Sequence, residues 1–128
     1  MTSSEKFFLK WNNFHYNISS TFKDMKEDSD FADVTLAGEG NQKIEAHNVI
    51  LAASSKFFKD LLQQNKHPHP LLYMIGIKGK HLSAIIDFMY HGEANIYEED
   101  LNDFLAVAEK LEFKKDQQGL TTSKILLI

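Results

Sequence analysis

The chain of 128 residues predicts an α+β fold, in which short strands are combined with amphipathic helices. Val34, Thr35 and Leu36 are β-branched or apolar residues, which suit a half-buried strand. Turn residues rich in glycine follow them, and after Ala46 the spacing of the apolar residues becomes helical. A chain of this length is expected to form one domain with its own hydrophobic core.

The composition argues against several classes of protein. Without cysteine the chain has no disulfide, thiolate metal ligand or cysteine nucleophile, which favours a reducing compartment. All 14 basic residues are lysines and the net charge is −4, so direct binding of nucleic acid is not expected. Neither a signal-peptide core nor a membrane-spanning apolar run is apparent. Phosphate-loop and nucleophile-elbow motifs are missing as well, so we expect neither an enzyme nor a cofactor.

The first half of the chain is expected to contain a strand, a helix and a hairpin. Apolar residues alternate across Phe7–Trp11, which predicts a first strand. Asn12 or Asn13 is expected to cap the next helix. That helix carries one continuous apolar stripe, formed by Phe14, Ile18, Phe22 and Met25. A hairpin is expected from Asp33 to Ala46, with left-handed turn positions at residues 38–41.

The second half is expected to be mainly helical. A pair of helices is predicted over residues 47–64, with Ser54 or Ser55 capping the second helix. Two prolines make residues 65–70 a loop, and the apolar run at 71–75 predicts a buried strand. A third helical stripe runs over residues 82–89 and ends at Gly92, and the last helix begins near Glu98. The terminal sequence KILLI is expected either to dock as an extra strand or to mark where a longer protein was cut or spliced.

Short motifs occur in a fixed order along the chain: FLKWNN at 8–13, DVTLA at 33–37, SSKFF at 54–58, DFMYHGE at 87–93 and GLT at 119–121. In this order and spacing they resemble the BTB (POZ) domain of the insect tramtrack/bric-à-brac type, over residues 7–121, with terminal tails at 1–6 and 122–128. The resemblance implies a cluster of helices flanked by a small mixed β-sheet. It also assigns structural roles to His47, Phe57, Phe58, Tyr90 and Gly92.

The resemblance implies a nuclear protein-interaction module rather than an enzyme. Such a domain is expected to form homodimers or larger assemblies, to mix with other BTB proteins and to act in the regulation of transcription or chromatin. The alternative from another class is a substrate adaptor of the cullin-3 ubiquitin ligase. That role usually requires a helical extension and a substrate-binding domain after the BTB domain.

The N-terminal strand has two alternative partners. It either covers the core of its own chain or pairs with another protomer, because an isolated terminal strand needs an edge to join. BTB domains of this type exchange it between the subunits of a dimer, which implies the second alternative. The residues then expected at the dimer interface are Phe7, Phe8, Leu9, Trp11, Phe14, Ile18 and Phe22.

One charged pocket departs from the family pattern. Relatives usually carry Lys or Arg after the Ala-His pair, where this chain has Asn48. In related transcription factors that cation and the residue equivalent to Asp33 form a charged pocket at the dimer interface. A buried carboxylate without a partner is costly, so either Asp33 finds other donors or the groove is chemically altered.

The histidines are expected to be structural. His67 and His69 lie in a proline-fixed loop and are not expected to bind a metal. His47 is expected to form a hydrogen bond at the junction of hairpin and helix. His81 and His91 are expected to be exposed residues at helix ends.

Overall fold

The computed structural model describes residues 4–113 and has the predicted α+β fold. Expectations for residues 1–3 and for 114–128, including the GLT motif and the KILLI tail, lie outside the described residues. The elements in chain order are α1 (Phe14–Met25), β1 (Val34–Glu39), β2 (Lys43–Ala46), α2 (Asn48–Ser54), α3 (Lys56–Gln64), β3 (Leu71–Lys78), α4 (Gly79–His91) and α5 (Glu98–Lys110).

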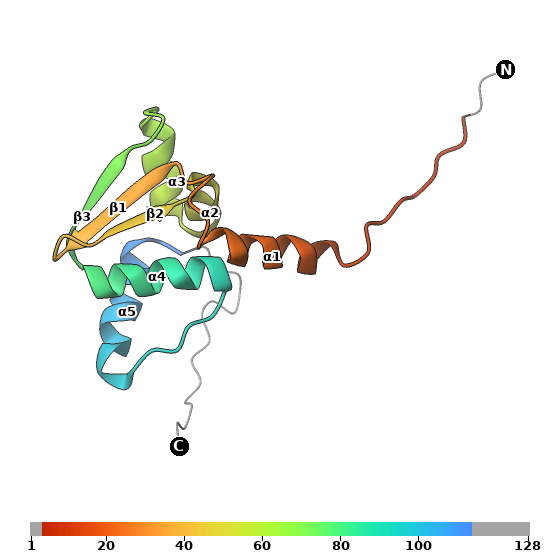
Figure 1. Cartoon of the computed structure of the whole chain (residues 1–128). Coiled ribbons are helices and arrows are strands. Elements are labelled where there is room, and N and C mark those ends of the chain that lie inside the picture. Colours follow the sequence, from red (N-terminus) through yellow and green to blue (C-terminus); the bar gives the residue numbers. More distant parts are fainter. Residues whose placement is uncertain (1–3, 114–128) are drawn as a thin grey trace.

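The sheet is small and mixed, as predicted. Its three strands have the order β2-β1-β3, in which β1 pairs antiparallel with β2 and parallel with β3. Helix α4 contacts both β1 and β3, and α5 packs on α4. Figure 1 shows α2 and α3 behind the sheet and α4 across its lower end, so the helices leave the opposite face uncovered.

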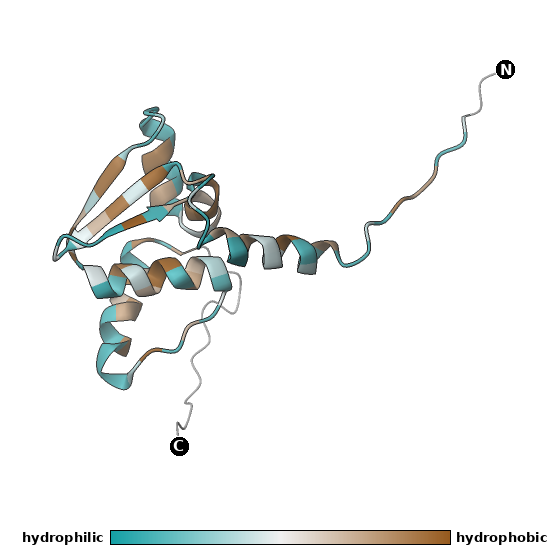
Figure 2. Ribbon diagram, viewed as in Figure 1, coloured by the Kyte–Doolittle hydropathy of each residue, from teal (hydrophilic) through white to brown (hydrophobic). Residues whose placement is uncertain are grey.

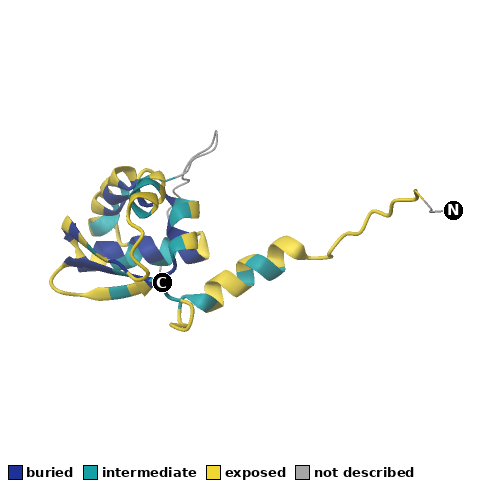
Figure 3. Ribbon diagram, turned by 90° about the horizontal axis from the view of Figure 1, so that it is seen from above, coloured by how far each residue is buried: buried dark blue, intermediate teal, exposed yellow. Residues whose placement is uncertain are grey.

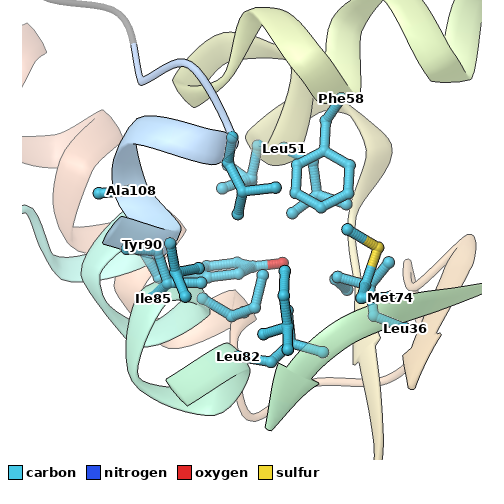
Figure 4. Packing of buried hydrophobic residues seen from close by; sticks show 14 of the residues in the cluster. Leu36, Leu51, Phe58, Met74, Leu82, Ile85, Tyr90 and Ala108 are labelled. Carbon is cyan, nitrogen blue, oxygen red and sulfur yellow. The ribbon is translucent and has the colours of Figure 1, made fainter. Parts of the chain in front are cut away.

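The core lies between the inner face of the sheet and these helices. Figure 4 shows side chains from β1, β3 and four helices meeting there. Leu36, Leu51, Phe58, Leu82 and Ile85 have no exposed surface, which is typical of a close-packed interior.

The hairpin turn uses fewer left-handed residues than expected. Among residues 38–41, only Gly40 and Asn41 have positive φ, at 99° and 63°. Gly38 lies within β1, where a Cβ atom would stand 2.9 Å from the carbonyl oxygen of Ile77. Glycine is therefore required at position 38 by close packing of the backbone rather than by the turn.

The strand β3 differs most from its prediction. It runs on to Lys78, and it is an edge strand rather than a buried one. Met74 is buried, whereas Leu71, Tyr73 and Ile75 are exposed. The prediction was wrong because an uninterrupted apolar run hides the alternation that a strand with one covered face adopts.

The ends of the helices follow the predictions in two places and depart from them in one. Ser55 caps α3 by accepting a hydrogen bond from the Phe58 N–H at 3.1 Å, and Gly92 ends α4 with φ 78°. The predicted asparagine cap of α1 is wrong. Asn13 precedes that helix with a left-handed φ of 62°, and its side chain makes no capping hydrogen bond.

Candidate interaction surface

The segment before α1 projects away from the rest of the chain. Residues 4–11 are extended but form no strand in the single chain, and they do not cover its core. Phe7, Phe8 and Leu9 are 81–89% exposed, and Trp11 is 60% exposed. In Figure 2 this segment contains a strongly apolar stretch that has nothing packed against it.

Helix α1 continues the same exposed surface. None of its residues is buried; Ile18 and Met25 are half-buried, while Phe14 and Phe22 are exposed. Figure 3 shows the helix leaving the buried part of the molecule with most of its residues exposed. The apolar stripe predicted for this helix is therefore present in the sequence but only partly covered in the single chain.

The C-terminal end of α1 is attached to α4 by an ion pair that sequence reasoning missed. Lys26 Nζ lies 2.6 Å from Asp87 Oδ1. The hydrogen bond to Asp87 raises the pKa of Lys26, so the ammonium group stays charged at neutral pH. The helix is thus held at one end while its N-terminal end extends outward.

The predicted interface residues follow one another along the extended segment and α1, and we call this set the N-terminal strip. The Trp11 and Phe14 rings lie 5.3 Å apart, so the strip continues from the extended segment onto α1. The strip consists of Phe7, Phe8, Leu9, Trp11, Phe14, Ile18 and Phe22. Exposed apolar surfaces of this kind mark sites where proteins associate.

The Asp33 carboxylate finds a donor in the backbone. Its Oδ1 accepts a hydrogen bond of 2.7 Å from the Asn48 N–H at the start of α2. Its own N–H donates to the carbonyl oxygen of Ala46 at 3.1 Å. Because helix N-termini favour negative charge, this position compensates the carboxylate without a cationic side chain. The side chain of Asn48 leaves its Oδ1 buried without a hydrogen-bond partner among the described residues.

His47 and Tyr90 join the hairpin–helix junction to α4. The His47 N–H donates to Tyr90 Oη at 3.0 Å, and His47 Nδ1 lies 2.6 Å from the same oxygen. Burial raises the pKa of Tyr90 to about 12, and the negative charge of Asp33 adds to this effect. The tyrosine is therefore neutral, and its hydroxyl proton is available to Nδ1.

The remaining residues with expected structural roles lie at packing and turn positions. Phe58 is fully buried, and the half-buried Phe57 packs against it with ring centroids 5.4 Å apart. Gly92 occupies the left-handed position after α4, where a side chain would be strained.

The histidine predictions need one correction. His81 was expected to be exposed, but it is buried between α4 and α5, with Nε2 3.4 Å from Asp103 Oδ2. The prediction failed because α5 covers the first turn of α4. His69, which was predicted to be a loop residue, lies with its Nε2 2.8 Å from Thr35 Oγ1 of β1, within hydrogen-bonding distance.

Residues 4–113 contain neither a metal-binding cluster nor a membrane-spanning helix. No group of three or more His, Asp or Glu side chains in that range is arranged to hold a metal ion. In the same range no helix has the length and apolarity to cross a membrane.

The chain matches a known family and several proteins of Drosophila melanogaster. The model of the BTB/POZ domain family matches residues 22–124. The chain is 43% identical over 114 residues to the Longitudinals lacking protein-like, and the match covers 89% of each chain. It is 40% identical over 111 residues to the Broad-complex core protein isoforms and 38% identical over 119 residues to the alpha isoform of Protein tramtrack. These matches cover 87% and 93% of this chain but only 15% and 14% of those longer proteins.

Solved structures show the same fold at lower identity. The BTB domain of zebrafish PATZ1 matches with a TM-score of 0.71 and 23% identity, over 83% of this chain and 86% of that one. The BTB domain of human Gigaxonin matches with a TM-score of 0.68 and 20% identity, over 85% and 89%. Family model, relatives and fold agree with the motif series in the sequence. The chain therefore belongs to the BTB/POZ domain family, among relatives of the tramtrack and bric-a-brac type.

Proposed function

We propose that this BTB domain forms a homodimer through the N-terminal strip. The observation that carries the proposal is the exposure of Phe7, Phe8, Leu9 and Trp11 in the single chain. Contiguous apolar surface of this kind favours aggregation unless a partner covers it. A second copy supplies that cover without a further component, because each subunit offers the same strip.

The form of the strip supports an exchange of N-terminal segments between the subunits. Residues 4–11 are already extended, and α1 holds them away from their own core. An extended segment gains backbone hydrogen bonds when it joins a sheet edge of another chain. A dimer that also covers the exposed part of α1 would bury about 2,000 Å² or more, as stable homodimers do.

The biological role proposed is association of nuclear regulators of transcription or chromatin. The relatives Broad-complex core protein and Protein tramtrack are much longer than the match, so the domain is a small part of each. Joining two such chains raises the effective concentration of whatever segments they carry. The partners of the domain would be a second copy and other BTB proteins. The domain would act by binding them and would catalyse no reaction.

The proposal is tested with two deletions and light scattering. Removal of residues 1–11 is expected to lower the mass of the assembly, because it removes the exposed aromatic residues of the segment. Removal of residues 1–6 is the matched control, since it leaves Phe7–Trp11 in place and is expected to preserve the mass. An unchanged mass after the longer deletion would contradict the proposal.

A further inference from the structure

A cavity of about 220 Å³ lies where β3, α4 and α5 meet. It is lined by residues 76–78 at the end of β3, by His81 in the first turn of α4 and by one face of α5 from Asp103 to Lys110. In Figure 1, α4 follows directly from β3, and α5 lies beneath it. The volume has room for several water molecules or for a small ligand. No residue of the N-terminal strip lines the cavity, so it is a separate feature of the domain.

Small side chains keep this cavity open. Gly76 has a left-handed φ of 81°, and a Cβ atom at this residue would lie 3.8 Å from Lys110 Nζ. Ala106 is an exposed residue of α5 that lines the cavity with only a methyl group. The buried residues Ile77 and Val107 supply an apolar wall. A larger side chain at position 76 or 106 would occupy the space, so the cavity depends on the size of these two residues.

Two lysines bring positive charge to the cavity from different elements. Lys78 is the last residue of β3, and Lys110 is the last residue of α5. Neither lysine forms an ion pair within residues 4–113, whereas Lys80 is paired with Asp100 at 3.1 Å. Lys78 also directly precedes α4, whose N-terminus has no side-chain cap. Because a helix N-terminus favours negative charge, the two ammonium groups and this end of α4 all attract an anion.

His81 adds a buried polar atom without a hydrogen-bond partner. The residue is 6% exposed, and its Nε2 makes no hydrogen bond within the described part of the chain. Asp103 Oδ2 lies 3.4 Å from this atom without forming a hydrogen bond to it. Because Asp103 lines the same cavity, Nε2 lies on the cavity side of the imidazole ring. Buried polar atoms nearly always have a partner, so Nε2 indicates a group bound in the cavity.

The charges that line the cavity favour an anion. Lys78 and Lys110 together outweigh the carboxylate of Asp103, which is the one acidic side chain in the lining. The Asp103 side chain is 65% exposed, so water weakens its repulsion of an anion. Glu39 accepts a hydrogen bond from the Gly76 N–H at 3.2 Å, but it is not part of the lining. The cavity therefore carries net positive charge within a chain whose own net charge is −4.

We propose that this cavity binds a phosphoryl group. Its hydrogen-bond donors come from three elements, with Lys78 on β3, His81 on α4 and Lys110 on α5. A phosphoryl group has three strong acceptor oxygens and close to two negative charges, so it can engage donors from all three elements. A carboxylate has only two oxygens and one charge, and therefore fits this donor set less well. The group belongs either to free phosphate or to a phosphorylated side chain of a protein partner, and the experiment distinguishes these two sources.

Titrations of the full chain, followed by the NMR shifts of its backbone amides at constant ionic strength, test the site. The three ligands are inorganic phosphate, a short phosphoserine peptide and the same peptide without phosphate. Saturable shifts at His81, Val107 and Lys110 are expected with the first two ligands and not with the third. Tighter binding of the phosphopeptide would identify a phosphorylated side chain as the source. Equal or tighter binding of inorganic phosphate would identify the free ion.

Separate variants test the charge and the shape of the cavity. Lys110→Gln and Lys78→Gln are each expected to weaken binding about tenfold, as the loss of a hydrogen bond to a charged group does. Lys59→Gln removes an exposed lysine of α3 outside the cavity and is expected to change nothing. Ala106→Leu is expected to abolish binding, because it fills the cavity without a change of charge. Asn102→Leu, elsewhere on α5, is its control and is expected to bind normally.

The amide spectra also show whether each variant is folded, and the two lysine variants test the site if Ala106→Leu does not fold. Normal binding by a folded Ala106→Leu, or an equal loss for Lys59→Gln and Lys110→Gln, would overturn the cavity as the site. The absence of saturable shifts with both phosphorylated ligands would overturn the phosphoryl proposal itself. The inference does not depend on the proposed dimer, because the deletion of residues 1–11 leaves every lining residue in place.

Discussion

The Asp33 carboxylate and the Asn48 backbone N–H are 2.7 Å apart, so an acidic residue before β1 fixes the start of α2. Because the donor is a backbone group, this contact does not depend on the side chain at position 48. The charged pair expected from relatives is thus replaced by a helix-capping interaction. Position 48 itself supplies no cation, and the Asp33 carboxylate accepts the backbone N–H of that residue instead.

Replacement of Asp33 is expected to destabilise the domain. Asp33→Ala removes the acceptor of the Asn48 N–H and should lower the free energy of unfolding by about 1 kcal/mol, as the loss of a helix cap does. Asp33→Asn keeps an acceptor oxygen and should cost less. Urea unfolding of the three proteins measures the difference, and equal losses for both variants would contradict the capping role.

Asn48→Lys is expected to preserve the fold and to change association. The backbone hydrogen bond to Asp33 remains, and the buried Asn48 Oδ1 that has no partner in the described region is removed. The free energy of unfolding should therefore change by less than about 0.5 kcal/mol. The new cation beside Asp33 should strengthen binding to other BTB domains, which pull-down of purified relatives measures. If the wild type and Asn48→Lys capture every relative equally, the hypothesis that Asn48 alters the binding pocket is refuted.

Ser55→Ala is expected to be the most destabilising of the small substitutions. Ser55 Oγ accepts the Phe58 N–H at 3.1 Å and donates to the Leu111 carbonyl, while the residue itself is fully buried. Its loss leaves a helix N-terminus and a carbonyl after α5 unpaired, at a cost of about 2 kcal/mol. Thermal or urea unfolding measures the loss. Ser54→Ala is the matched control, and a similar loss there would contradict this account.

The helices were predictable because their apolar residues repeat with helical spacing. Residues such as Ile85 and Phe104 lie at such positions and are buried in the structure. Capping signals were also local: Ser55 precedes α3 and Gly92 follows α4 in the sequence. The family was predictable for the same reason, because its motifs are short segments in a fixed order.

Features that depend on distant contacts were not predictable. Nothing near Lys26 in the sequence indicates that it meets Asp87, because α1 and α4 are brought together only by the fold. The burial of His81 depends on α5, which begins many residues later. The exposure of Ile75 depends on the place of β3 at the edge of the sheet. This place follows from the crossover between β1 and β3, which the local sequence pattern does not reveal.

The Lys26–Asp87 ion pair is expected to position α1 more than to stabilise the domain. Lys26→Gln should reduce the free energy of unfolding by less than about 1 kcal/mol, because the pair is partly exposed. The same change should increase hydrogen exchange across α1, since it releases the end of the helix attached to α4. Lys23→Gln in the last turn of α1 is the control. Faster exchange of α1 in the control alone would contradict the attachment role.

Tyr90 is expected to make the domain sensitive to alkaline pH. Its pKa is about 12 in the folded chain and about 10 when unfolded, because burial disfavours the phenolate. The stability that neutral Tyr90 provides is complete below pH 10 and is lost between pH 10 and about 12, since the unfolded chain releases this proton first. Tyr90→Phe should reduce this dependence in urea unfolding across that range.

The same variant separates the pH effect from the hydrogen bonds. Tyr90→Phe leaves the backbone N–H and Nδ1 of buried His47 without their common partner, which should cost about 1–2 kcal/mol at neutral pH. Tyr16→Phe on the exposed surface of α1 should show neither effect. If the unfolding free energies of Tyr90→Phe and the wild type fall in parallel above pH 10, proton release by another group causes the alkaline loss. Tyr90 would then act on stability only through its contact with His47.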